Sequence, residues 1–139
     1  MPHVDIRVNP KISESGVIER LVENMPTIVA EALSTELGTE GSLTAEEIDV
    51  TVQSYGSRDI YHHDIGIMII ANDYPARSQN LKERAQTIND RVEKFLENAK
   101  LALHIQMEER QTIKCYVWVL LAKGEFKEFT RLLIDNELP

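Results

Sequence analysis

Apolar and polar side chains alternate along three stretches of the sequence, which predicts half-buried strands. The first stretch is residues 2–8 (Pro-His-Val-Asp-Ile-Arg-Val), in which every second residue is apolar. The same period of two recurs over 48–53 and over 101–107, and β-branched residues make the first two stretches typical of strands. A continuous apolar run over 65–71 predicts a further strand that is buried on both faces. The pattern therefore predicts four strands before residue 110.

Two longer stretches place apolar residues three and four positions apart, which predicts amphipathic helices. The first extends from 15 to about 37, with Ser13 or Ser15 as its N-terminal cap and a kink at Pro26. The second helix extends from about 78 to 98. Each predicted helix lies between two predicted strands.

The order strand, helix, strand thus occurs twice. A helix that connects two strands in this way makes the strands parallel within each unit. We expect a single domain over 1–139 of the α+β class, with one β-α-β unit at 1–60, a second at 61–110 and an oligomerisation tail at 111–139. Within that tail, 113–121 is apolar enough for another strand or a buried element, and a short terminal helix should follow it.

Two such units can form one four-stranded mixed sheet with both helices on one face. The other face of the sheet would then be left uncovered. Because the third strand and the tail are strongly apolar, we expect other copies of the chain to cover that face.

The charge of the chain limits its partners. The 139 residues contain 15 basic and 23 acidic side chains, a formal net charge of −8. Binding to nucleic acid or to an anionic membrane surface needs a basic patch, so we expect neither partner. No apolar stretch approaches the roughly 18 residues of a membrane span. The single cysteine, Cys115, and the lack of an apolar leader favour a cytoplasmic protein.

The second residue is the first candidate for chemistry. Initiator methionine is removed before a small residue, so Pro2 is expected to begin the mature chain with a free secondary amine. Desolvation at the edge of an apolar sheet would lower the pKa of that amine. A neutral amine can take a proton or attack a carbonyl group. Alternatively, Pro2 is only the first residue of a strand, a position where proline is tolerated.

Three short segments extend this argument to a family. The opening residues 2–8 resemble the first strand of the tautomerase superfamily, whose members use an amino-terminal proline as general base. Residues 76–82 (Ala-Arg-Ser-Gln-Asn-Leu-Lys) are similar to the entry to the second helix in the longer members, and Met25-Pro26-Thr27 looks most like the 5-carboxymethyl-2-hydroxymuconate isomerase branch. The resemblance covers roughly residues 1–110 and implies a homotrimer that acts on a small unsaturated carboxylic acid.

The resemblance also suggests which side chains hold the substrate. It implies that Arg77 binds a substrate carboxylate, for which a guanidinium group is well shaped. Lys11, after the first strand, and Arg58, after the second, are weaker candidates, and an exposed charge explains each better than a substrate contact does. Glu108 or Glu109 is similar in position to the water-activating glutamate of the cis-type 3-chloroacrylic acid dehalogenases. Glutamates at the end of a strand are more often simply solvated.

The sequence indicates no metal and no cofactor. His62-His63-Asp64 is a run of adjacent residues, and adjacent side chains of an extended chain point to opposite sides. A metal site needs three or four convergent ligands. The resemblance, together with Pro2, implies an isomerase that moves a proton within an unsaturated 2-hydroxy or 2-oxo acid. The alternatives are a non-catalytic oligomeric binding domain and a hydrolytic dehalogenase of haloacrylate-like acids that also depends on Pro2.

Overall fold

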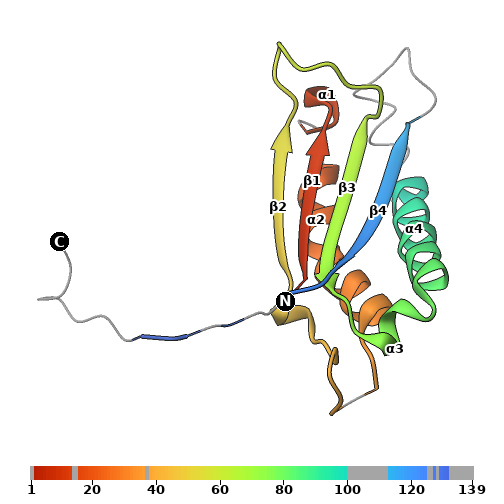
Figure 1. Ribbon diagram of the computed structural model, residues 1–139. Coiled ribbons are helices and arrows are strands. Elements are labelled where there is room, and N and C mark those ends of the chain that lie inside the picture. Colours follow the sequence, from red (N-terminus) through yellow and green to blue (C-terminus); the bar gives the residue numbers. More distant parts are fainter. Residues whose placement is uncertain are drawn as a thin grey trace, which may run out of the picture.

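The four described strands form one mixed sheet. The computed structural model describes residues 2–13, 16–36, 38–99, 113–124, 127 and 129–131. Its strands are β1 (His3–Val8), β2 (Asp49–Ser54), β3 (Ile65–Asn72) and β4 (Cys115–Ala122), and their order in the sheet is β2-β1-β3-β4 (Figure 1). β1 is parallel to β2 and antiparallel to β3, whereas β3 is parallel to β4. This arrangement is two β-α-β units joined in one sheet, and it confirms the predicted fold class.

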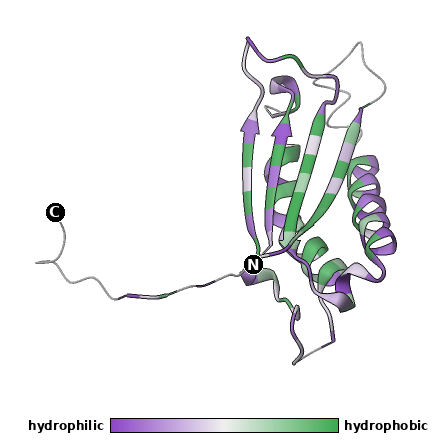
Figure 2. Cartoon of the chain, in the orientation of Figure 1, coloured by the Kyte–Doolittle hydropathy of each residue, from purple (hydrophilic) through white to green (hydrophobic). Residues whose placement is uncertain are grey.

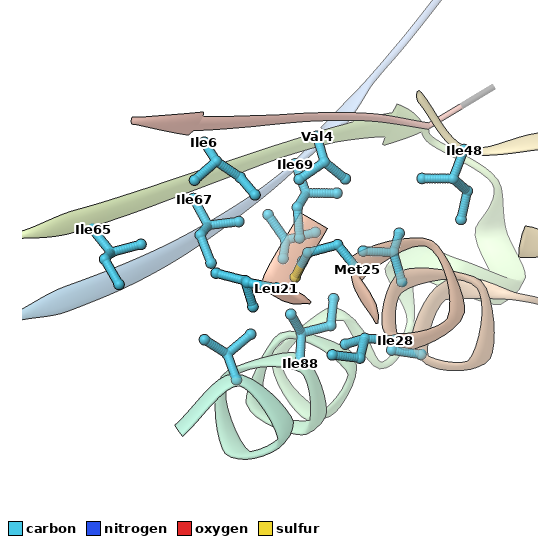
Figure 3. Close-up of a cluster of buried hydrophobic side chains, with 14 of the residues drawn as sticks. Val4, Ile6, Leu21, Met25, Ile28, Ile48, Ile65, Ile67, Ile69 and Ile88 are labelled. Carbon is cyan, nitrogen blue, oxygen red and sulfur yellow. The ribbon is translucent and has the colours of Figure 1, made fainter. Parts of the chain in front are cut away.

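Two long helices, α2 (Val17–Leu33) and α4 (Leu81–Asn98), lie on the same face of the sheet (Figures 1 and 3). Three short elements connect the others, namely α1 (Pro10–Ser13), the 3₁₀ turn η1 (Ala45–Glu47) and α3 (Pro75–Ser78). Pro26 lies inside α2, as expected, but the residue before the helix is Gly16 and not a serine. Gly16 has φ 79°, which is a left-handed conformation that suits glycine. No described helix is both long and apolar enough to cross a membrane.

The hydrophobic core lies between the sheet and these two helices. Every second residue of β1 and β3 points into it, which is why both strands alternate or are strongly apolar in sequence. Figure 3 shows the strand side chains facing those of α2 and α4. The core includes Val4, Ile6, Ile65, Ile67 and Ile69 from the strands, and Leu21, Met25, Ile28 and Ile88 from the helices.

The fourth strand of the sheet differs from the expected one. The expected strand over 101–107 lies outside the described residues, and the place beside β3 is taken by Cys115–Ala122. This strand overlaps the apolar stretch at 113–121 of the expected tail, for which another strand or a buried element was expected. In β4, alternate residues from Cys115 to Leu121 pack on the core, whereas Tyr116, Trp118 and Leu120 belong to the opposite face of the strand.

The second face of the sheet, here called the open face, is not covered by any described helix. Figure 2 shows hydrophobic and hydrophilic residues in alternation along β1 and β2, whereas β3 and β4 contain few hydrophilic residues. On the open face, Ile70 of β3 is 41% exposed and Trp118 of β4 is 54% exposed. β3 is therefore buried on one face and only partly on the other, which corrects the expectation of a strand buried on both faces. The Tyr116 ring lies directly over Gly66. A Cβ atom at Gly66 would lie 2.6 Å from that ring, so the position has no room for a larger side chain.

Candidate functional site

Pro2 is buried at the beginning of a central strand. It directly precedes β1, which has β2 on one side and β3 on the other. The carbonyl group of Pro2 accepts a hydrogen bond of 3.3 Å from the backbone N–H of Asp49, at the start of β2. The pairing of β1 with β3 ends with His3 beside Ile70. Continued by one residue pair, it places Pro2 beside Ala71. The walls around Pro2 are therefore the start of β2 and the end of β3.

Arg77 is the predicted site residue that lies at the same end of the sheet as Pro2. Its side chain is 1% exposed. Nε donates to the Leu33 carbonyl at 2.9 Å, Nη1 to the Asn72 carbonyl at 2.8 Å and Nη2 to the Gly41 carbonyl at 2.8 Å. The guanidinium carbon also lies 5.2 Å from the centre of the Tyr74 ring. In this arrangement Arg77 binds the backbone of its own chain, which favours a structural role over the substrate contact that the resemblance implies.

The charge of Arg77 has no carboxylate partner among the described residues. Burial lowers its pKa from the ordinary value, the Tyr74 hydroxyl opposes this shift, and the nearby Arg84 adds to it. Buried charges in proteins are usually paired, and here three carbonyl dipoles and an aromatic ring replace the counter-charge.

Arg84 is a second arginine whose side chain donates to backbone carbonyl groups, and it was not among the site residues expected from the sequence. Its Nη1 donates to the carbonyls of Ala32 and Ser34 at 2.9 Å each, at the C-terminal end of α2, and its Nη2 donates to Ala76 at 3.2 Å. One signal was available in the sequence. Arg84 lies in the first turn of α4, where the helix dipole disfavours a cation, so a partner outside the helix was to be expected.

Lys11 and Arg58 lie at the opposite end of the sheet from Pro2. Lys11 belongs to α1, directly after β1, and Arg58 belongs to the connection after β2; both are exposed. Because β1 and β2 are parallel and six residues long, these cations are separated from Pro2 by about the length of a strand, roughly 20 Å. One chain does not bring them to Pro2. Glu108 and Glu109 lie outside the described residues.

Four aromatic side chains gather at that opposite end. The rings of Tyr55 and Tyr61 stack with their centres 4.1 Å apart, and His63 meets Tyr116 edge-on at 4.9 Å. Burial, and after it the proximity of Tyr116, raises the pKa of Tyr55. His63 is thus engaged in an aromatic contact. Its neighbour Asp64 accepts hydrogen bonds from Asn9 Nδ2 at 3.2 Å and from the Lys114 backbone N–H at 2.9 Å. Within the described ranges, no three or more metal-ligating side chains converge.

A pocket of about 390 Å³ lies between α4 and the start of β4. Val92, Leu96 and Glu93 line it from the helix, and Ile113 and Cys115 line it from the strand side. Burial, followed by the nearby Asp64 carboxylate, raises the pKa of the Cys115 thiol to about 11. The thiol is therefore protonated at neutral pH, which makes it a poor nucleophile.

We expect Cys115 to react slowly with iodoacetamide at pH 8 in the folded protein. A rise of the pKa from 9.0 to about 11 lowers the thiolate fraction at that pH by roughly 100-fold, and the thiolate is the reactive form. The rate, followed by intact mass, should increase with pH up to about 11. The chain unfolded in guanidinium is the control, and equal rates in the two states would contradict the expectation.

Solved structures with a similar fold were found. The macrophage migration inhibitory factor-like protein from Entamoeba histolytica matches with a TM-score of 0.52 and 14% identity, over 93% of this chain and 95% of that chain. A 5-carboxymethyl-2-hydroxymuconate delta-isomerase matches with 0.49 and 10% identity, over 95% of this chain and 88% of that chain. A malonate semialdehyde decarboxylase matches with 0.48 and 10% identity, over 92% and 90% of the two chains.

No protein-family model and no curated protein matches the sequence. At 14% identity, the likeness to the Entamoeba protein concerns the fold alone. The expectation of a particular family rests on the resemblance of the sequence segments described above.

Proposed function

We propose that this protein is a tautomerase that moves a proton within an unsaturated 2-hydroxy or 2-oxo carboxylic acid, similar to the 5-carboxymethyl-2-hydroxymuconate isomerases. Pro2, freed by removal of Met1, is the general base. The observation that carries the proposal is the position of Pro2, which is buried at the start of a central strand of the sheet.

The chemistry follows from an amine in such a place. Removal from water disfavours the protonated form of an amine, so burial would lower the pKa of the Pro2 nitrogen once Met1 is removed and favour the form that accepts a proton. It takes the proton from the enol hydroxyl or from an allylic carbon, which leaves a dienolate. The same proton then returns to a conjugated carbon, so the substrate gains and loses no atoms overall. Donors that hold the negative charge of the dienolate would lower the barrier.

The substrate carboxylate needs a cation, and the buried Arg77 is occupied by backbone carbonyls. Lys11 and Arg58 are exposed but lie a strand length from Pro2 in the same chain. We therefore propose that Lys11 or Arg58 of a neighbouring copy completes the site. This proposal requires an assembly in which the far end of one sheet approaches the Pro2 end of the next.

A homotrimer of about 48 kDa, three chains of 15.9 kDa, is the proposed assembly. The resemblance implies the number of subunits, and the open face supports an interface between copies, because Ile70 and Trp118 are large apolar side chains left exposed in one chain. Exposed apolar area of this kind in a soluble domain is typical of an interface between subunits.

Replacing Trp118 by glutamate is expected to dissociate the assembly at micromolar concentration. The change removes a large apolar side chain from the open face and adds a charge that would be desolvated in an interface. Sedimentation velocity of the wild type and the variant measures this directly. Thr87→Glu, which adds the same charge on the exposed side of α4, is the control and should leave the assembly intact. A wild type that sediments as a monomer would refute the trimer.

The state of the amine can be tested without knowledge of the substrate. Incubation with pyruvate and cyanoborohydride at pH 7 should alkylate Pro2, because a neutral secondary amine forms an iminium ion with the ketone, which the hydride then reduces. Mass spectrometry of the N-terminal peptide reads the product. A chain that retains Met1, or a Pro2 that stays unlabelled, would favour the non-catalytic binding domain.

A further inference from the structure

Arg77 connects three segments of the chain at the end of the sheet where Pro2 lies. Its three hydrogen bonds go to Leu33 at the end of α2, to Gly41 in the turn at 38–44, and to Asn72 at the end of β3. α3, which carries Arg77, and the N-terminus lie at the same end of the sheet in Figure 1. Leu33 ends α2, Gly41 belongs to the connection that follows it, and Asn72 ends β3, so the guanidinium group links this connection to the end of β3.

Two of these three segments continue along the chain into the walls beside Pro2: β3 immediately, and the turn at 38–44 by way of η1. Asn72 follows Ala71, the residue that the register places beside Pro2. The turn at 38–44 continues through η1 to Asp49, whose N–H donates to the Pro2 carbonyl. The Arg77 contacts therefore hold one wall through β3 and the other through the turn.

We propose that Arg77 is a positioning residue for Pro2. It holds the start of β2 and the end of β3, the two walls beside Pro2, in place without touching the substrate. The inference rests on the proposed function for its catalytic consequence, but its structural part stands on the hydrogen bonds alone. It assigns this arginine a role different from the carboxylate binding that the resemblance implies. The two roles make opposite predictions for a single substitution.

Arg77→Lys keeps the charge but loses the planar group that reaches three carbonyls. If Arg77 positions Pro2, kcat of the variant should fall by a factor on the order of 10 to 100 while KM stays within about twofold, because misplacement of the base affects the reaction more than substrate binding. If Arg77 instead binds the substrate carboxylate, KM of the variant should rise strongly. A large rise in KM with kcat unchanged would overturn the proposal.

Arg84→Lys is the matched control. Arg84 also donates to backbone carbonyls, but at Ala32, Ser34 and Ala76, none of which belongs to a wall of Pro2. It should lower the melting temperature without changing kcat by more than about twofold. An equal loss of kcat in both variants would show that Arg77 acts only through general stability, and it would also overturn the proposal.

If Arg77→Lys does not fold, Gly41→Ala tests the same contacts from the other side. Gly41 has φ 87°, and a Cβ atom there would lie 2.8 Å from the Tyr74 ring and 3.1 Å from Arg77 Nη2. The substitution displaces the turn while Arg77 remains. The expected signature is again a fall in kcat with little change in KM, and an unchanged kcat would contradict the proposal.

Amide hydrogen exchange separates the failure of this inference from the failure of the proposed function, because it needs no substrate. In Arg77→Lys, the Asp49 amide, which donates to Pro2, should exchange roughly tenfold faster or more. The Tyr55 amide, which donates to Val8 at the far end of β1, should keep its protection. Unchanged protection at Asp49 would overturn the inference even in an active enzyme. The predicted pattern in an inactive protein would uphold the positioning of Pro2 and refute the tautomerase function.

Discussion

Replacing Pro2 by alanine is expected to slow the ketonisation of 2-hydroxymuconate or phenylenolpyruvate by a factor on the order of 10² to 10⁴, the usual contribution of a general base. Alanine keeps an amino terminus but replaces the secondary amine by a primary amine with more rotational freedom. The proton acceptor is then less basic and less well placed. The change in ultraviolet absorbance as each enol is consumed, followed with the mature wild type beside the variant, gives the rates.

Two controls make this result interpretable. The intact mass of each protein must show that Met1 is absent, because an amide nitrogen is not a base. Circular dichroism should show equal folding, because the Pro2 carbonyl that bonds to Asp49 is retained in alanine. A variant as active as the wild type would exclude Pro2 as the base. If neither protein acts on either compound, chloride release from a haloacrylate becomes the next assay, and the binding-domain hypothesis gains support.

Replacing Ile67 by alanine is expected to destabilise the fold by about 2–5 kcal/mol, the range for large-to-small changes in a core. Ile67 is fully buried in β3, with Ile6 of β1 on one side and Val117 of β4 on the other. Hydrogen bonds of the sheet hold both neighbours, so the cavity cannot close by movement of the strands. Urea denaturation followed by circular dichroism measures the change in the free energy of unfolding.

Ile60→Ala is the matched control because it removes the same atoms from a side chain that is 89% exposed. Its free energy of unfolding should stay within about 0.5 kcal/mol of the wild type. If the assembly contributes to stability, both variants must be compared at the same protein concentration. A loss at Ile67 no larger than that at Ile60 would contradict the assignment of the core.

β1 and the two long helices were predictable because each has one buried side, whereas β2 shows the alternating sequence of a half-buried strand although none of its residues is buried in the single chain. In β1, the alternation of buried and exposed residues from His3 to Val8 follows the pleat of the strand. In α2, buried residues from Val17 to Leu33 repeat with the period of the helix. Such patterns depend only on the geometry of one element and on which of its sides meets the core.

Local pattern did not decide which segment forms the fourth strand, because both 101–107 and 113–121 were candidates. Residues 101–107 alternate, whereas 115–122 form an apolar run without a polar face, and local pattern favours the first as a strand. The place beside β3 belongs to Cys115–Ala122, because both of its faces carry apolar side chains and one of them packs on the core. Which apolar run pairs with a given strand depends on contacts between residues distant in sequence, and periodicity carries no information about those contacts.

The candidate site shows the same division. The sequence by itself determined the two repeated units, the uncovered sheet face and Pro2 as the residue with the most distinctive chemistry, because these follow from periodicity and residue type. Only the tertiary structure decided that Arg77 is buried among the carbonyls of Leu33, Gly41 and Asn72, and that Lys11 and Arg58 lie a strand length from Pro2. The local sequence around an arginine in a short helix is the same whether its side chain faces solvent or backbone carbonyl groups. Its surroundings are set by segments that only folding brings together.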